Sequence, residues 1–191
     1  MRIVLLGAPG SGKGTQAALL HKRLQLPHIS TGVLLREAVK NATPLGLQAQ
    51  EILDRGDLVP DAVMLDLIEE RLGQDDVAAG FLLDGYPRNI SQAEALEALL
   101  ERLDQPVDEA IQIDVDPEQI VARILKRAAE EGRSDDSEEV FRNRMQVYEE
   151  HTAPVADFYA QQGKLTRILG EGTVEDVQNT ILGVLEMNSA R

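Results

Sequence analysis

The sequence predicts an α/β fold, a doubly wound parallel sheet of five strands with helices on both faces. Five short and mainly apolar runs have the length and composition of strands, at 2–6, 27–29, 81–84, 110–115 and 164–169. Helical patterns separate these runs, and strands that alternate with helices are typical of a parallel sheet covered on both sides. The first run is continuously apolar, which indicates a strand buried on both faces.

Each segment between the strands carries a signal for the start of a helix. Ser30 or Thr31 can open a helix that continues to about residue 40, and Pro60 suits the first turn of another. Asp116 followed by Pro117 is a further helix start. We expect helices at about 14–24, 31–40, 45–54, 60–72, 91–103, 117–132, 137–162 and 174–187.

Two of these helices also carry capping signals formed by side chains. Ser91 and Glu94 have the spacing of a capping box, which predicts a helix start at Ser91. Thr173 and Asp176 stand where they can cap the last helix.

The composition describes one globular domain without covalent cross-links. The chain has 191 residues, 43% of them hydrophobic, which is enough for a substantial core. It has no cysteine, which excludes disulfides and thiolate zinc sites. The formal charge of -14 argues against nucleic acid or an anionic membrane as a partner. Without a signal-peptide core, a membrane-length apolar run or a heptad pattern, we expect a cytoplasmic monomer.

Residues 7–15 read Gly-Ala-Pro-Gly-Ser-Gly-Lys-Gly-Thr, directly after the first predicted strand. Glycines let such a loop curl so that backbone N–H groups point at a phosphate, and the following helix adds its positive end. The loop departs from the pattern G-x-x-x-x-G-K-[ST], because Gly14 separates Lys13 from Thr15. The residues that we expect to hold the phosphates of a nucleoside triphosphate are Gly10, Ser11, Gly12, Lys13, Gly14 and Thr15.

Asp84 stands at the carboxyl end of a predicted buried strand. Parallel sheets bind their ligands beyond the carboxyl ends of the strands, where the glycine loop also begins. Because a carboxylate is rarely placed at the end of a buried strand without a role, we assign Asp84 and the loop to one site. The three histidines, His21, His28 and His151, are scattered, and we expect them at the surface or in packing.

Three separated stretches resemble the adenylate kinase family: GAPGSGKGT at 7–15, ISTGVLLR at 29–36 and LLDGYPRN at 82–89. The resemblance covers essentially the whole chain. It implies a single P-loop kinase domain with a core at 1–29, 60–126 and 137–191, a helical monophosphate-binding insertion at 30–59 and a short lid at 127–136. It also implies reversible transfer of the γ-phosphoryl group of Mg-ATP to AMP, which gives two ADP.

The resemblance assigns an acceptor site whose base contact is Gln92. The amide of Gln92 can donate and accept, which matches N1 and N6 of adenine. Related uridylate and cytidylate kinases tend to carry asparagine there and alanine in place of Thr31, so AMP is the favoured acceptor. Val33 departs from the family, which usually has aspartate at this position. The matching AMP-binding residues are Thr31, Arg36, Asp57, Leu58, Val59, Gly85, Arg88, Gln92, Arg133 and Arg144.

The donor side joins the glycine loop to arginines later in the chain. Arg123 and Arg127 are four residues apart, so they project from one helix face and can clamp a polyanion. The resemblance assigns ATP contacts to both and to Gly172, and it assigns Asp84 the orientation of Mg²⁺ through water. The residues that we expect to act in catalysis are Lys13, Arg88, Arg123, Arg127, Arg133 and Arg144.

The acceptor is itself a phosphate oxyanion, so the transfer needs no general base and no covalent nucleophile. Two alternatives stay open. One is a kinase of the same fold that uses UMP or CMP, and the other is a nucleotide-binding switch without turnover. The chain lacks the NKxD guanine signature of a GTPase switch.

Overall fold

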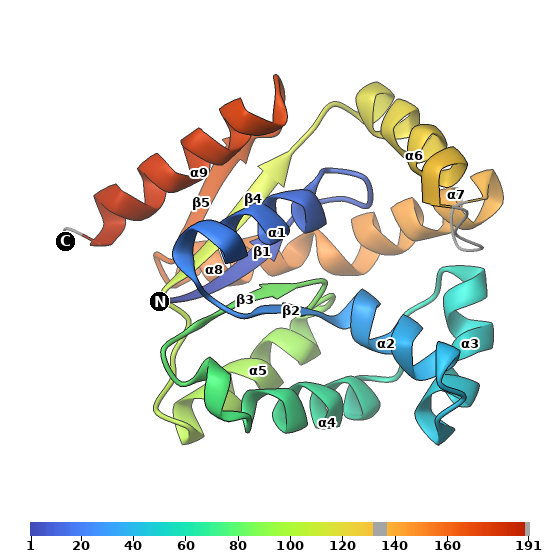
Figure 1. Ribbon diagram of the computed structural model, residues 1–191, viewed down its shortest axis with the longest axis horizontal. Helices are drawn as coiled ribbons and strands as arrows, with labels where there is room; N and C mark the ends of the chain where they lie inside the picture. Colours follow the sequence, from blue (N-terminus) through green and yellow to red (C-terminus); the bar gives the residue numbers. More distant parts are fainter. Residues whose placement is uncertain (132–136, 190–191) are drawn as a thin grey trace.

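The computed structural model describes residues 1–131 and 137–189, with side chains over 1–124 and 137–188. The strands of this part are β1 (Arg2–Leu6), β2 (His28–Ser30), β3 (Phe81–Asp84), β4 (Glu109–Asp114) and β5 (Leu165–Leu169). They form one five-stranded sheet in the order β2-β3-β1-β4-β5, and every neighbouring pair is parallel (Figure 1). The predicted fold class is therefore confirmed.

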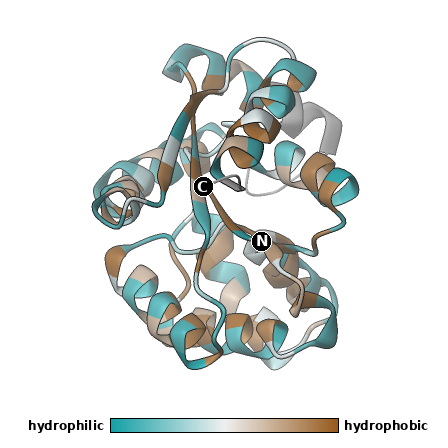
Figure 2. Ribbon diagram, turned by 90° about the vertical axis from the view of Figure 1, so that its left-hand side faces the viewer, coloured by the Kyte–Doolittle hydropathy of each residue, from teal (hydrophilic) through white to brown (hydrophobic). Residues whose placement is uncertain are grey.

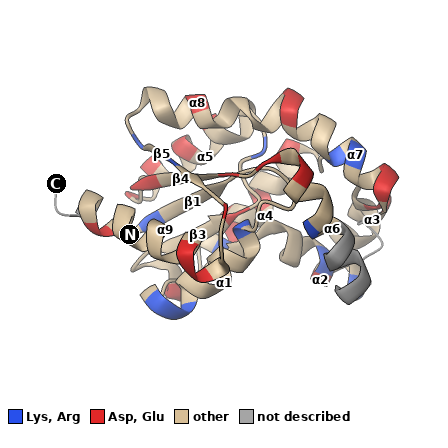
Figure 3. Cartoon of the chain, turned by 90° about the horizontal axis from the view of Figure 1, so that it is seen from above, with Lys and Arg blue, Asp and Glu red and all other residues tan. Residues whose placement is uncertain are grey.

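Helices cover both faces of the sheet, as a doubly wound fold requires. They are α1 (Lys13–Leu24), α2 (Thr31–Lys40), α3 (Pro44–Arg55), α4 (Asp61–Leu72), α5 (Ile90–Arg102), α6 (Pro117–Glu131), α7 (Glu138–Val147), α8 (Pro154–Gln161) and α9 (Val174–Ser189). Seen from above, α1 and α9 lie on one side of the sheet and α5 and α8 on the other (Figure 3). A short 3-10 turn at Asp75–Val77, which the sequence did not predict, precedes β3.

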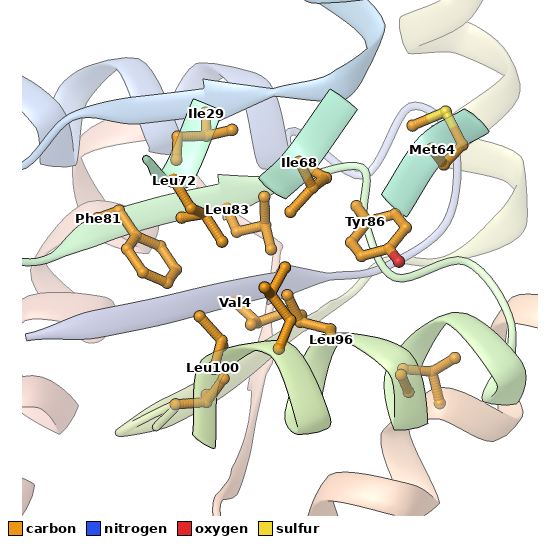
Figure 4. Close-up of a cluster of buried hydrophobic side chains, with 14 of the residues drawn as sticks. Val4, Ile29, Met64, Ile68, Leu72, Phe81, Leu83, Tyr86, Leu96 and Leu100 are labelled. Carbon is orange, nitrogen blue, oxygen red and sulfur yellow. The ribbon is translucent and has the colours of Figure 1, made fainter. Parts of the chain in front are cut away.

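The central strand β1 supplies side chains to two separate hydrophobic layers. Val4 and Leu6 join the layer that includes α4, α5 and α8, whereas Ile3 and Leu5 join the layer that includes α1 and α9. All four are at most 5% exposed. Successive side chains of a strand point to opposite faces, so a continuous apolar run can serve both layers. Figure 4 shows the first layer around Val4, and Figure 2 shows hydrophobic residues along the strands.

The start of α5 differs from the sequence prediction by one residue. Asn89, not Ser91, is the cap, because its Oδ1 accepts a hydrogen bond from the Gln92 N–H at 2.8 Å. Asparagine and serine are about equally good N-cap residues, but Asn89 Nδ2 also donates to Asp61 Oδ1 at 2.9 Å, which holds its side chain at the cap. At the start of α2, the N-cap residue Ser30 makes no side-chain cap bond.

The prediction of a single helix at 137–162 is wrong in its middle. This part of the chain consists of α7, a π-helical turn at Tyr148–Thr152 and α8. Pro154 has no N–H to continue an α-helical ladder, and the preceding Ala153 N–H donates to Tyr148 O, five residues back, at 2.8 Å. The proline therefore explains why the helix changes its winding here.

The carboxyl ends of the strands meet at one edge of the sheet, opposite the two chain termini (Figure 1). At this edge the loops that follow β1, β3 and β5 come together. Over residues 1–131 and 137–189, no helix has the length and apolarity needed to cross a membrane.

Candidate active site

A cleft of about 700 Å³ opens at the carboxyl edge of the sheet. Basic side chains that line it are Lys13, Arg36, Arg88, Arg123 and Arg144. Among the lining residues of the described chain, Asp84 is the only carboxylate. The chain carries a net charge of -14 and its acidic residues are spread over many helices (Figure 3). Such a local excess of cations in an acidic protein indicates a polyanionic ligand.

The glycine loop between β1 and α1 forms one wall of this cleft. Gly7, Gly10 and Gly12 have φ values of 142°, 83° and 96°. A Cβ at Gly7 would lie 2.6 Å from the carbonyl oxygen of Ile113, so only glycine fits there. Gly12 is the N-cap of α1, and it has no side chain that could cap the helix. The first N–H groups of a helix have no partner within it, so this helix start suits an anion.

Two basic side chains connect the glycine loop to its surroundings. Lys13 Nζ donates to two carbonyl oxygens of the loop, at 2.6 and 2.9 Å. Arg123, on α6, donates to Ser11 O at 3.2 Å and to Gly170 O at 2.8 Å. Arg123 therefore joins the loop after β1 to the loop after β5, and it lines the cleft.

Asp84 lies at the end of β3, 9% exposed, with its carboxylate toward the glycine loop. His28 Nε2 lies 3.5 Å from Oδ2, and Ser30 Oγ donates to the same oxygen over 3.5 Å. Burial raises the pKa of this carboxyl, but the contact with His28 and the charges of Lys13, His28 and Arg88 together hold it below its usual value. Asp84 is therefore a carboxylate at neutral pH.

The loop after β3 brings Thr31 and Arg88 together on one carbonyl oxygen. Gly85 O accepts from Thr31 Oγ1 at 2.8 Å and from Arg88 Nε at 2.7 Å. From the other side, Thr152 of the π-helical turn donates its hydroxyl to Arg88 O at 2.7 Å. Arg88 is thus fixed through both its backbone and its side chain, and its guanidinium lines the cleft.

A second, narrower pocket adjoins the cleft at Gly85 and Arg88, which line both. Five further residues predicted to bind AMP line it, namely Thr31, Asp57, Leu58, Val59 and Gln92. Gln92 is 2% exposed; its Oε1 accepts from the Arg88 N–H at 2.8 Å and its Nε2 donates to Asp61 Oδ1 at 2.8 Å. The structure therefore brings most of the predicted acceptor residues into one place.

The segment that carries Asp57 rests on α7. Asn143 Nδ2 donates to Asp57 Oδ1 at 2.9 Å and to Arg55 O at 2.8 Å. The hydrogen bonds from Asn143 and from Arg55 hold the pKa of the Asp57 carboxyl below its usual value. The predicted monophosphate-binding segment is therefore anchored to the core through polar contacts.

Three further predicted site residues, Arg36, Arg144 and Gly172, also line the cleft. Arg36 lies over Gly32, and Arg144 lies beside Gly56; both arginines line the cleft. Gly172 lines the cleft in the loop before α9, with a φ of 92°. Arg133 and the side chain of Arg127 lie outside the described residues, as do residues 132–136 of the predicted lid at 127–136.

Sequence reasoning missed three residues of this site. The expectation that His28 has only a surface or packing role is wrong, because it lines the cleft against Asp84. The contact arises because β2 pairs in parallel with β3, with Ser30 opposite Asp84. The sequence shows polar residues in both strands, but it does not show that the two strands are neighbours. Thr152 and Asp61 gave no signal, because their partners are 64 and 31 residues away in the sequence.

A glycine loop that opens a helix at the carboxyl edge of a parallel sheet, in a cation-lined cleft, defines a nucleotide-binding protein of the P-loop class. A family model described as "Adenylate kinase" matches residues 5–164. The chain belongs to the adenylate kinase family.

Curated relatives agree with this assignment over nearly the full length of the chain. An adenylate kinase of Xanthomonas campestris pv. campestris (strain 8004) is 56% identical over 181 residues, 95% of this chain and 97% of the relative. One of Stenotrophomonas maltophilia (strain K279a) is 50% identical over 186 residues, 97% of this chain and 100% of the relative.

Proposed function

We propose how the described residues divide the work of moving the γ-phosphoryl group of ATP to AMP, giving two ADP. The chain is a phosphotransferase of the adenylate kinase family, and its cleft has to hold two nucleotides end to end. The observation that carries the proposal is that five basic side chains line the cleft at the carboxyl edge of the sheet, with Asp84 as the one carboxylate among its described lining residues.

The donor ATP binds at the glycine loop. The residues that would contact its phosphates are Gly10, Ser11, Gly12, Lys13, Gly14 and Thr15. Lys13 Nζ, which rests on two loop carbonyls, turns to the phosphate oxygens, because an ammonium group gains more from an anion than from a carbonyl. Arg123 and Gly172 stand on the neighbouring wall, where the base and the outer phosphates would lie. Arg127 completes the donor side in this proposal.

The acceptor AMP binds between the cleft and the narrower pocket. Arg36 and Arg88 take its phosphate, and Gly85 leaves room for it beside Thr31. The loop at Asp57, Leu58 and Val59 and the amide of Gln92 surround the adenine. Arg144, with Arg133, would approach the transferring group from the far side.

The site also suits Mg²⁺ that arrives with the ATP. Asp84 is an ionised carboxylate at the cleft, and a Cβ at Gly14 would lie 3.5 Å from its Oδ2, so the carboxylate faces the end of the glycine loop, where α1 begins. Hard cations such as Mg²⁺ prefer oxygen and keep several waters, so Asp84 would hold the ion through water. When bound, Mg²⁺ neutralises charge on the phosphates.

Catalysis in this proposal is positioning and charge neutralisation. The attacking group is an oxygen of the AMP phosphate, so no residue has to remove a proton from it. Lys13, Arg88, Arg123 and Arg144 supply fixed positive charge around the transferring group, where each preorganised donor is worth about 10²–10³ in turnover.

A coupled assay at fixed Mg-ATP tests the choice of acceptor. AMP, UMP and CMP are compared by kcat/KM, and we expect AMP to be preferred by orders of magnitude. A better rate with UMP or CMP would refute the assignment of the narrower pocket to adenine. Nucleotide binding without any ADP formation would instead indicate a switch.

A further inference from the structure

The side-chain amide of Gln92 is held in one orientation by groups whose direction is unambiguous. The backbone N–H of Arg88 donates to it at 2.8 Å. A backbone N–H can only donate, so the amide atom that faces it has to be the oxygen. The Nε2 group therefore points the other way, and it donates to Asp61 Oδ1 at 2.8 Å.

A second branch of the same network ends at Asp61 as well. The Gln92 backbone N–H donates to Asn89 Oδ1 at 2.8 Å, so Asn89 Nδ2 has to face away from it. That Nδ2 donates to Asp61 Oδ1 at 2.9 Å. Two N–H groups, each fixed in direction by a backbone N–H at the other end, thus converge on one carboxylate oxygen.

This network leaves a defined face of the Gln92 amide for a ligand. A primary amide has two N–H donors and two acceptor lone pairs, and the contacts with Asp61 and Arg88 use one of each. One donor and one acceptor, in a fixed order, remain on this amide, and Gln92 lines the narrower pocket. Adenine presents an acceptor at N1 and a donor at N6, whereas a 6-oxopurine presents a donor at N1 and an acceptor at O6.

We propose that Asp61 is a positioning residue that sets the purine specificity of the acceptor site. With the Arg88 N–H at the oxygen end, Asp61 holds the nitrogen end of the Gln92 amide, and without Asp61 a single hydrogen bond holds the amide. The fixed order of donor and acceptor accepts adenine and opposes a 6-oxopurine, which meets donor with donor and acceptor with acceptor. The inference rests on the proposed function, in which the base of AMP contacts Gln92.

The burial of the two side chains makes this discrimination strong and also testable. Gln92 is 2% exposed, so water cannot repair a mismatched contact with a base. Asp61 is only partly buried, so water can enter if its carboxylate is removed. Water donates as well as accepts, and it would tolerate either direction of the amide on that side.

The test compares AMP with inosine monophosphate, which has nearly the same shape, by kcat/KM at saturating Mg-ATP. We expect the preference for AMP to fall at least fivefold in Asp61→Ala and in Asp61→Ser, because neither provides a fixed acceptor. Asp61→Asn keeps an acceptor oxygen that Asn89 Nδ2 orients, so its preference should stay within twofold of the wild-type value. A merely structural role would not move this ratio while the KM for ATP is unchanged.

Asn89→Ser is the matched control. Serine also caps helices, and this change removes the Asn89 donor while leaving the contact between Asp61 and Gln92 in place. We expect it to keep the wild-type preference. An unchanged preference in folded Asp61→Ala and Asp61→Ser would overturn the inference.

A Gln92→Leu variant separates failure of the inference from failure of the proposed base contact. It should lose most of the preference for AMP. If Gln92→Leu lowers the preference but both Asp61 variants do not, the role of Asp61 is wrong and the base contact stands. If Gln92→Leu keeps the full preference, the proposed contact is wrong, and the inference falls with it.

Discussion

Gly85→Ala adds one methyl group where the acceptor side of the cleft is built. Gly85 has a φ of 81°, a left-handed conformation that costs an alanine about 1–2 kcal/mol. The new Cβ would lie 2.8 Å from Thr31 Oγ1, and Thr31 is fully buried and cannot move away freely. Relief of such overpacking costs about 1–3 kcal/mol more. The sum, about 2–5 kcal/mol, corresponds to a fall in Tm of roughly 4–20 °C for a chain of this length.

Substitutions at two other glycines separate the conformational cost from the cost of the close contact in this loss of stability. Gly163 has a φ of 68°, and a Cβ added there would have no heavy atom within 4 Å, so Gly163→Ala should lose only the conformational part, about 1–2 kcal/mol. Gly183 lies inside α9, also with nothing within 4 Å of an added Cβ, and Gly183→Ala should gain up to about 1 kcal/mol.

Thermal unfolding of the wild-type chain and the three variants gives the comparison. We expect the order Gly183→Ala, wild type, Gly163→Ala, Gly85→Ala from highest to lowest Tm. In steady-state assays Gly85→Ala should also raise the KM for AMP more than the KM for ATP. A Gly85→Ala protein as stable as Gly163→Ala, with an unchanged KM for AMP, would refute the close contact with Thr31.

Three further predictions concern the charged residues of the cleft. Arg88→Ala should lower kcat by about 10²–10³. Arg88→Lys should recover only part of this lost turnover, because an ammonium group lacks the planar fork of the guanidinium. Near-normal turnover in Arg88→Ala would contradict the role of Arg88. Asp84→Asn should raise the Mg²⁺ concentration for half-maximal rate by about 10–100-fold at fixed ATP, measured by Mg²⁺ titration, and an unchanged titration would remove Asp84 from the metal site. The pKa of Asp84 is lowered in the folded chain, so its stabilising contribution is present above the unfolded value of 3.8 and is lost as pH falls through the folded value. Acid unfolding should therefore be less steep below about pH 4 in Asp84→Asn, and identical curves would contradict the shift.

The fold could be predicted from the sequence because its signals are local. Each of the five strands is a short segment that carries apolar residues, and the observed bounds lie within a residue of those expected. Helix ends are harder to place where two signals compete. Asn89 and Ser91 can both cap α5, and only the position of Asp61, which accepts from Asn89, distinguishes them. Pro154 was the visible sign that the predicted helix at 137–162 would change its winding.

The candidate site could be predicted only where its residues belong to continuous motifs. The glycine loop and Asp84 follow strands whose carboxyl ends share an edge, so their proximity follows from the topology. The contact of His28 with Asp84 depends on the order of the strands, which a single strand pattern does not reveal. The Gln92 amide accepts a hydrogen bond from Arg88 and donates one to Asp61, which lies 31 residues earlier in the sequence. The sequence does not reveal that these side chains meet.

Incubation of the purified chain with ADP and Mg²⁺ alone tests the central claim most directly. If one cleft holds two nucleotides and moves a phosphoryl group between them, ³¹P NMR should show ATP and AMP appearing in equal amounts, without free phosphate. Formation of free phosphate, or no ATP at all, would contradict the transfer.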